Sequence, residues 1–320
     1  MIDVWLIGHT FDGWDNWKEQ AQLNLLAKSF LQLGCDFKFI TLDKLKIYDN
    51  SRLVVYDNEV FEPPNIAIIK TYIHTNFWKN KLSRLQEIGS LVINDPIKAV
   101  DYDNKINIYQ KAQINNIPMP KTIFMPYSHC DDLKLNEIEN TIGWPCIIKP
   151  NLGWGGIGLN IVNSRNDMRN SIISSHKHYN ENFKGYGLKP THFIAQEIVK
   201  AEGMISAINV GKNVYASIYH GSGTHLTKTY YKNNFLSDSY NKKFVVVPID
   251  PPDNLIELIS KIRNLYDLKL FKAEFFITQS GFSFCEINTT AGFILNSLIS
   301  RINIADDIAK YAVNLWQSTQ

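Results

Sequence analysis

A glycine-dense segment between two apolar runs holds the first residues that could do chemistry. Residues 143–162 read GWPCIIKPNLGWGGIGLNIV, and Lys149 lies at the end of the first apolar run. The loop after it contains Gly153, Gly155, Gly156 and Gly158. Glycine lets bare N–H groups approach an anion closely, and a nearby lysine can meet the same anion as a point charge. The pattern predicts strand, lysine, phosphate-covering loop and strand, with an ordinary glycine-rich hairpin as the alternative.

Two other phosphate-binding motifs do not fit this segment. A Walker loop closes with Gly-Lys-Ser/Thr, which is missing here, and a dinucleotide fingerprint opens a helix. Residues 159–162 instead have strand composition.

A second chemical pattern lies in residues 271–288, FKAEFFITQSGFSFCEIN. Two runs of strand composition flank a three-residue loop, which predicts a hairpin. Glu274 then faces Glu286, Lys272 faces Asn288, and alternation places all four side chains on one face of the hairpin. The opposite face is expected to be apolar, formed by Phe271, Ala273, Phe275, Ile277, Cys285 and Ile287.

Two carboxylates directly opposite each other repel unless a cation lies between them. Carboxylate and amide oxygens are ligands that Mg²⁺ accepts, with phosphates completing its shell. The hairpin therefore predicts a metal site at Glu274, Glu286 and Asn288. The alternative is a solvated face with a tolerated carboxylate pair, and a register slip of one residue would break the arrangement.

Composition limits the classes of protein that remain. A chain of 320 residues with net charge +2 suggests roughly two domains and no general polyanion binder, so we expect no nucleic-acid partner. The four cysteines form no Cys-x-x-Cys, which favours a reducing, cytoplasmic compartment. No apolar run approaches the roughly 20 residues that span a bilayer, and the first residues lack the basic region of a signal peptide, so we expect no membrane partner.

The first 95 residues have the alternation of a small open α/β domain. Short apolar runs predict strands at residues 3–8, 37–40, 52–56, 65–69 and 91–94. Helical spacing predicts helices at 17–33, ended by Gly34, and at 75–88. Strand, helix and strand at this spacing are typical of a parallel sheet.

The remaining residues mix helices and strands. Helices are expected at 105–116, 129–141, 167–176, 254–266 (with Asp253 as its N-cap) and 306–316. Strands are expected at 122–125, 159–162, 193–199, 205–210 and 213–219. Two long polar stretches, 176–191 and 221–243, show no period, and we expect loops of the kind that often act as lids.

The order of these elements resembles the ATP-grasp family. The family's first lysine, helix and proline-containing exit are similar to Asp103-Asn104-Lys105 and Ile117-Pro118-Met119-Pro120. Its second lysine is similar to Ile148-Lys149-Pro150, and its hinge strand to Gln196-Glu197-Ile198-Val199. Glu286-Ile287-Asn288 resembles its metal-binding Glu-x-Asn, and Glu274 stands where the partner acid is found. Within the family the chain looks closest to the RimK-type amino-acid ligases.

The resemblance implies a mixed α/β, ATP-grasp fold. Residues 1–95 would form an N-terminal α/β domain and residues 96–320 the ATP-grasp domain, with a small lid subdomain at about 120–200 and a C-terminal subdomain at 201–320. It also implies that a carboxylate takes the γ-phosphoryl group of ATP and that an amine attacks the acyl phosphate. Amide, ADP and phosphate are released.

The resemblance assigns roles to individual residues. Lys105 and Lys149 would hold the nucleotide phosphates, and the glycine loop would cover them. The segment Gln196, Glu197, Ile198 and Val199 would hold adenine. Glu274, Glu286 and Asn288 would hold Mg²⁺, with Mn²⁺ as an alternative ion.

Two departures from the family pattern affect these roles. Relatives carry Asp-Ile-Arg where this chain has Met204-Ile205-Ser206, so Glu202 is the candidate for the missing acid near the ribose. His220 stands where relatives have an arginine after the next strand. Lys228 or Lys232 could replace that arginine, and His220 could be a weaker, pH-dependent substitute for it or polar filler. Lys149, His220 and Lys228 are therefore the candidate catalytic residues.

Three functions remain open from the sequence. The first is a carboxylate–amine ligase whose partners are ATP, an acid, and an amine on an amino acid, peptide or protein end. The second is a peptide-modifying or macrocyclising ligase, and the third a non-catalytic nucleotide-binding regulator. The retained lysines and metal-type residues favour an enzyme. The substrates and the oligomeric state, a homo-oligomer included, stay open.

Overall fold

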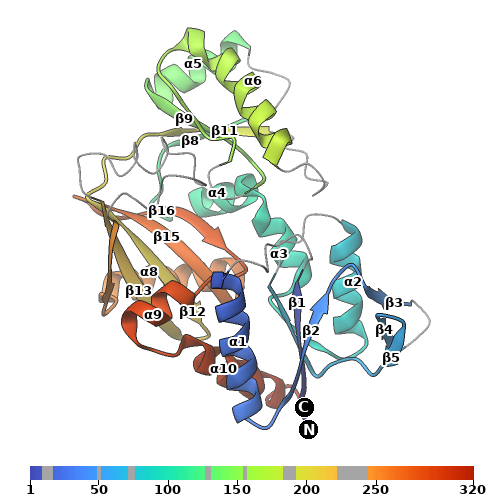
Figure 1. Cartoon of the computed structure of the whole chain (residues 1–320). Coiled ribbons are helices and arrows are strands. Elements are labelled where there is room, and N and C mark those ends of the chain that lie inside the picture. The colour runs from blue at the N-terminus through green and yellow to red at the C-terminus, as the bar shows by residue number, and fades with distance from the viewer. Residues whose placement is uncertain are drawn as a thin grey trace.

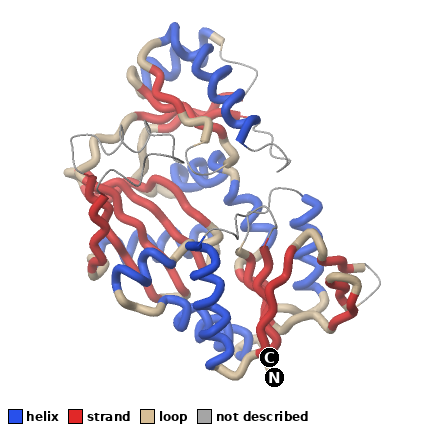
Figure 2. Tube along the Cα trace, viewed as in Figure 1, coloured by secondary structure: helices blue, strands red, loops and turns tan. Residues whose placement is uncertain are grey.

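A computed structural model gives the fold, and it describes residues 1–8, 17–48, 52–70, 76–126, 131–153, 157–182, 192–221 and 244–320. The sheets gather in three places (Figure 1): a parallel sheet at the lower right, an antiparallel sheet at the top, and a larger antiparallel sheet at the left. The tube view in Figure 2 shows helices lying against each of them.

The parallel sheet is buried on both faces, because helices cover both. Its strands are ordered β2 (Asp36–Thr41), β1 (Asp3–Gly8), β6 (Ile66–Ile69) and β7 (Leu91–Ile93). Val4 and Leu6 of β1 pack in the cluster that includes α1 (Trp17–Gln32), whereas Trp5 and Ile7 pack in the cluster that includes α2 (Asn76–Glu87). The predicted strands and helices of this region are confirmed.

Several short elements of this region were not predicted from the sequence. The strands β3 (Leu45–Ile47), β4 (Val54–Tyr56) and β5 (Glu59–Phe61) form a small antiparallel sheet, of which only β4 was expected. Three residues are too few to display a period. The helix α3 (Pro96–Asp103) was also missed, although Asp95 caps it by accepting hydrogen bonds from the N–H groups of Ile97 and Lys98.

The second sheet carries the glycine loop. Its antiparallel strands are ordered β10 (Asn160–Val162), β9 (Cys146–Pro150), β11 (His192–Glu197) and β8 (Thr122–Pro126). The helices α5 (Asp132–Thr141) and α6 (Arg165–Asn182) pack on one of its faces. The predicted strand–loop–strand arrangement around the glycines is confirmed, because β9 and β10 pair with each other.

The expected loop at residues 176–191 is wrong for residues 176–182, which continue α6. Met168, Ile172, Ser175 and Tyr179 are all buried, and their spacing follows one helical face. The polar neighbours of Ser175 and Tyr179 concealed that face in the sequence. Most of the other expected lid, residues 222–243, lies outside the described residues, whereas Gly221 ends β13.

The third sheet carries the acidic hairpin. Its antiparallel strands are ordered β14 (Phe244–Ile249), β13 (Asn213–Gly221), β12 (Gly203–Val210), β15 (Leu270–Thr278) and β16 (Gly281–Asn288). On one face pack α8 (Asp253–Tyr266) and α4 (Lys105–Ile114). The predicted N-cap is wrong: Asp253 is the first helical residue, and Pro252 precedes it without a side-chain cap. The strand β14 was not predicted.

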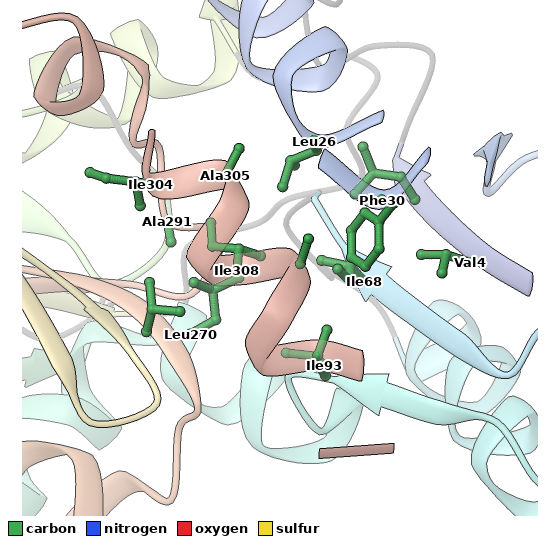
Figure 3. Packing of buried hydrophobic residues seen from close by; sticks show 14 of the residues in the cluster. Val4, Leu26, Phe30, Ile68, Ile93, Leu270, Ala291, Ile304, Ala305 and Ile308 are labelled. Carbon is green, nitrogen blue, oxygen red and sulfur yellow. The ribbon is translucent and has the colours of Figure 1, made fainter. Parts of the chain in front are cut away.

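One hydrophobic core joins the first and the third sheet (Figure 3). Ile308 of α10 (Ile304–Gln317) packs in the same cluster as Phe30 of α1, Ile68 of β6 and Leu270 of β15. The helix α9 (Ile294–Ser300) precedes α10. The parallel sheet is therefore fixed against the acidic hairpin's sheet. Among the described residues, no helix has the length and apolar character needed to cross a membrane.

A shared core predicts that both sheets respond to one substitution. Ile308→Ala removes a side chain that is 2% exposed, which should cost about 2–5 kcal/mol of unfolding free energy. Denaturant unfolding followed by tryptophan fluorescence and by circular dichroism should shift together. The control, Ile302→Ala, alters a side chain that is 45% exposed and should cost much less. Separate transitions, of which only one shifts, would contradict a shared core.

Candidate functional site

The hairpin of β15 and β16 brings the predicted acidic residues together. Glu274 pairs directly with Glu286, and Lys272 pairs with Asn288, so the predicted register at these four positions is confirmed. These four side chains lie on the face of the sheet opposite α8. The alternate residues Ala273 and Phe275 point to the other face, because they pack in the same cluster as α8.

The predicted turn of this hairpin is one residue too long. Thr278 pairs with Gly281, so two residues form the turn rather than three. A β-bulge next to Glu274 inserts one extra residue, Cys285, into β16 and restores the expected pairing. The expected place of Cys285 on the apolar face is therefore wrong: it packs with Met204 and Phe276 on the carboxylate side.

Lys272 already neutralises one carboxylate of the pair. Its Nζ lies 2.6 Å from Oε1 of Glu274, and the two side chains are 21% and 12% exposed. Burial disfavours the charged amine, but the adjacent Glu274 carboxylate outweighs it and raises the pKa of Lys272. The second oxygen, Oε2 of Glu274, is buried and finds no hydrogen-bond partner among the residues that the structure describes.

Three lysines act electrostatically on Glu286. Burial and the negative charge of Glu274 raise the pKa of Glu286, while Lys105, Lys272 and Lys149 act in the opposite direction. Residues from β9, α4 and β15 thus contribute charge to one carboxylate of β16. Of the predicted phosphate and metal residues, the structure brings Lys105, Lys149, Glu274 and Glu286 together.

Lys149 is a buried cation whose hydrogen-bond acceptors are neutral. Its Nζ donates to Oη of Tyr109 at 2.7 Å and to Oε1 of Gln196 at 3.0 Å. It also lies 4.8 Å from the centre of the Tyr109 ring. Burial lowers the pKa of Lys149, and Glu286 partly offsets that effect. A cation held this way is available to an anionic ligand. Tyr109, which also donates to the carbonyl oxygen of Cys285, was missed in the sequence.

Lys105 reaches the glycine loop. Its Nζ donates to the carbonyl oxygen of Gly153, and its N–H donates to the carbonyl oxygen of Asn151 at 2.9 Å. Gly153 and Gly158 both have positive φ, +102° and +78°. At Gly158 a Cβ would lie 2.8 Å from Cγ of Pro150, so close packing within the protein explains that glycine.

The middle of the glycine loop, with Gly155 and Gly156, lies outside the described residues. Lys228 and the side chain of His220 lie outside them as well. The backbone of His220 pairs with Val245 between β13 and β14.

The expected adenine segment joins β11 to the third sheet. Gln196 is buried, and besides accepting from Lys149 it donates to Oγ1 of Thr122 at 2.9 Å. The carboxylate of Glu197 accepts a hydrogen bond from the N–H of Lys121 at 2.8 Å. Glu197, Ile198 and Val199 line a cavity of about 680 Å³ together with residues of α8 and the tip of the β15–β16 hairpin. Because α8 covers the apolar face, this cavity lies away from Glu274 and Glu286.

Asn288 and Glu202 complete the predicted set. Oδ1 of Asn288 accepts hydrogen bonds from the N–H of Thr290 at 3.0 Å and from its hydroxyl at 2.7 Å. A cation can bind this oxygen if the hydroxyl turns away. Glu202 is exposed, and its N–H donates to the carbonyl oxygen of Ile277 at 2.8 Å.

The donor set fits a hard divalent cation. Mg²⁺ accepts carboxylate and amide oxygens as ligands. The site offers two opposed carboxylates and a neighbouring amide oxygen, and one carboxylate has a buried oxygen without a partner among the described residues. Within the described ranges, no group of three or more His, Cys, Asp or Glu side chains lies together as a metal site. This set has two carboxylates and would need ligand phosphates or water to complete a shell.

Removing one carboxylate should change how stability depends on pH. The pKa of Glu286 in the folded protein is raised above its ordinary value of 4.5, so the folded state binds the proton more tightly than the unfolded chain. The free energy of unfolding therefore falls as pH rises from that value through the raised pKa. The Glu286→Gln variant has no titrating group at this position. Its free energy of unfolding minus that of the natural protein should therefore increase with pH over this range and stay constant above it.

Thermal unfolding in EDTA between about pH 4 and pH 8 measures this difference. Glu257→Gln, at an exposed position of α8, is the matched control and should show little change at any pH. A difference that is constant with pH, or that favours the natural protein as pH rises, would contradict repulsion between Glu274 and Glu286.

This chain is similar to known proteins in sequence and in fold. The family model described as carbamoyl-phosphate synthase L chain, ATP binding domain, matches residues 104–194, which include Lys105 and Lys149. The chain is 22% identical over 306 residues to the tetrahydromethanopterin:alpha-L-glutamate ligase of Methanocaldococcus jannaschii, covering 94% of this chain and 97% of that relative.

Solved structures share the whole fold. The structure of the ATP-grasp ligase PsnB complexed with a minimal precursor superposes with a TM-score of 0.70 at 12% identity, covering 98% of each chain. The RimK domain protein ATP-grasp from Sphaerobacter thermophilus superposes with a TM-score of 0.62 at 16% identity, covering 97% of this chain and 99% of that one. The chain therefore has the fold of the ATP-grasp ligases, and the matched ATP-binding domain and the full-length relative support the ATP-grasp superfamily, with RimK-like ligases among the proteins that this chain resembles.

Proposed function

We propose that this protein is an ATP-dependent carboxylate–amine ligase. A carboxylate oxygen of the acid substrate attacks the γ-phosphorus of ATP, ADP leaves, and an acyl phosphate forms. An amine nitrogen then attacks the acyl carbon, phosphate leaves with the bonding electrons, and the amine loses a proton as the amide forms. This chemistry needs no side-chain nucleophile, since the chain has only to bind, orient and neutralise charge.

The observation that carries the proposal is the gathering of opposite charges around Glu286. Three lysines from separate elements, Lys105, Lys149 and Lys272, act on this carboxylate, and Glu274 lies directly across from it. A polyphosphate with its metal ion carries the charges that such a set would neutralise. Lys105 and Lys149 would bind the phosphates, Gly153 to Gly158 would cover them, and the segment from Gln196 to Val199 would hold adenine.

Glu274, Glu286 and Asn288 would hold Mg²⁺ or Mn²⁺. The bound ion would neutralise charge on the transferred phosphoryl group. The buried Oε2 of Glu274 supports this role, because it needs a partner that the described residues do not supply.

Lys272 is a candidate for the positive charge that relatives supply with the arginine of Asp-Ile-Arg, whereas His220 and Lys228 stay the candidates for the other arginine, after the following strand. Ser206, which takes the place of an arginine in the resemblance, pairs with Glu274 across β12 and β15. The positive charge absent at Ser206 is present one strand away, where Lys272 contacts the same carboxylate. The role of Glu202 near the ribose remains part of the proposal.

The arrangement of sheets supports the proposed division of the chain. Residues 1–95 hold the parallel sheet, residues 122–197 the glycine-loop sheet, and residues 203–288 the acidic sheet. We propose a cytoplasmic location, which the buried free thiols of Cys35, Cys146 and Cys285 support. We also propose that its partners are ATP, an acid and an amine, with nucleic acid and membrane excluded and a homo-oligomer left open.

A peptide-modifying ligase is the second candidate. The likeness over 98% of the chain to an ATP-grasp ligase complexed with its precursor favours it. In that case the acid or the amine would be a side chain or an end of a peptide.

The test measures ADP release by the purified protein with Mg-ATP. Pooled amino acids should stimulate release if both substrates are small, and a peptide pool should be required if one of them is a peptide. Glu286→Gln should release no ADP under either condition while still folding. Nucleotide binding with no ADP release under either condition would be the result expected of a non-catalytic regulator, and ADP release that never depends on an added acid and amine would show ATP hydrolysis without ligase activity.

Lys149→Met should weaken nucleotide binding while preserving the fold, because it removes a cation but keeps the apolar stem. A charge-assisted contact of this kind contributes about 1.5–3 kcal/mol, so affinity should fall roughly tenfold or more. Titration calorimetry with an ATP analogue measures the change. Lys111→Met is the matched control, since Lys111 also contacts a tyrosine, Tyr102, through a hydrogen bond and its ring. Equal affinities for the two variants would show that the phosphate site is misplaced.

A further inference from the structure

The segment after the Glu-x-Asn sequence is held by the first 95 residues. Residues 289–293, which link β16 to α9, receive contacts from Gln22, Lys70 and Asn94. These three side chains, here called the clasp, come from α1, from the end of β6 and from the end of β7. They are 1%, 7% and 3% exposed, so all three contacts are made in the protein interior.

Each clasp residue binds a main-chain group of the segment. Oε1 of Gln22 accepts from the N–H of Phe293 at 2.7 Å. Nδ2 of Asn94 donates to the carbonyl oxygen of Thr289 at 3.1 Å and also to that of Leu270 at the start of β15. Its Oδ1 accepts from the N–H groups of Lys269 and Leu270 at 2.9 and 3.0 Å. Asn94 thereby ties both strands of the acidic hairpin to β7.

Lys70 occupies the centre of the clasp. Its Nζ donates to the carbonyl oxygen of Thr290 and to that of Ala291 at 3.2 Å, and it lies 5.8 Å from the centre of the Phe293 ring. A cation bound to carbonyl oxygens makes stronger hydrogen bonds than a neutral donor. Ala291 and Phe293 also belong to the shared core, where Figure 3 shows Ala291 beside Leu270 and Ile308.

These contacts end at a proposed metal ligand. Lys70 fixes the carbonyl group of Thr290, and the N–H and hydroxyl of the same residue bind Oδ1 of Asn288. Groups that orient a ligand from outside the coordination shell commonly affect metal affinity by tenfold or more. Asn288 is the last residue of β16 and pairs with Lys272.

We propose that Lys70 is a positioning residue for the metal site, and that the clasp makes the first 95 residues part of the ATP site's supporting structure. The inference rests on the proposed function, because it concerns Asn288 as a metal ligand. A purely structural lysine would stabilise the fold without affecting how the nucleotide responds to Mg²⁺.

The test compares Lys70→Met with a lysine of the same chemistry elsewhere. Lys81 of α2 donates to the carbonyl oxygens of Leu42 and Leu45 and lies 4.4 Å from the centre of the Trp78 ring. Both variants, and Lys70→Arg, are titrated with ADP at increasing Mg²⁺ by calorimetry, and thermal unfolding in EDTA checks the fold of each. Lys70→Met should raise the Mg²⁺ concentration needed for half-maximal binding roughly tenfold, with metal-free ADP affinity unchanged.

Lys70→Arg should recover most of that loss, and Lys81→Met should lower the unfolding temperature without changing Mg²⁺ dependence. If Lys70→Met binds Mg-ADP like the natural protein, the inference is wrong. If Lys70→Met does not fold, Gln22→Met, which removes the acceptor for Phe293, should show the same Mg²⁺ shift, and an unchanged response would overturn the inference. If ADP binding to the natural protein does not depend on Mg²⁺, the proposed metal site itself is wrong.

Discussion

The structure depends on a costly arrangement: two carboxylates opposite each other on one hairpin face. Glu274 and Glu286 repel, and burial makes their charges harder to solvate. Lys272 offsets part of this cost through its 2.6 Å contact with Glu274, and more distant lysines act on Glu286. The remaining need for positive charge is what makes the face suited to a metal ion and a polyphosphate. Other elements of the chain supply that environment: β9 brings Lys149, α4 brings Lys105, and α8 with α4 supports the opposite face of the sheet.

Much of this site could be predicted from local sequence, because strand alternation places every second residue on one face. The pairing of Glu274 with Glu286 was obtained even though the turn was assigned one residue too many, since a bulge at Cys285 compensates. A bulge has no strong sequence signal, so the side on which Cys285 lies could not be predicted. The strands β3 and β5 were missed because three residues are too few to show a period. The helix α6 was predicted to end too early because polar residues occupy part of its buried face.

The contacts that could not be predicted are those between residues far apart in the sequence. Lys272 was placed on the correct face but without its partner, because the choice between a solvated lysine and an ion pair depends on three-dimensional burial. Tyr109 beneath Lys149, and the clasp of Gln22, Lys70 and Asn94, link segments separated by 40 to 271 residues. In the sequence, polar residues at the ends of strands and on helices cannot be distinguished from ordinary surface residues. Their contacts form because the shared core around α10 holds the first and third sheets together.

The hairpin face should bind a metal ion beside Lys272, at the oxygen of Glu274 that Lys272 does not contact. A crystal structure with Mn²⁺ and ADP tests it most directly, because Mn²⁺ can be located by its anomalous scattering. We expect an anomalous peak within bonding distance of Glu274 and Glu286, with Oε2 of Glu274 among the ligands and phosphate oxygens completing the shell. A peak elsewhere, or nucleotide bound with no metal between these two carboxylates, would contradict it.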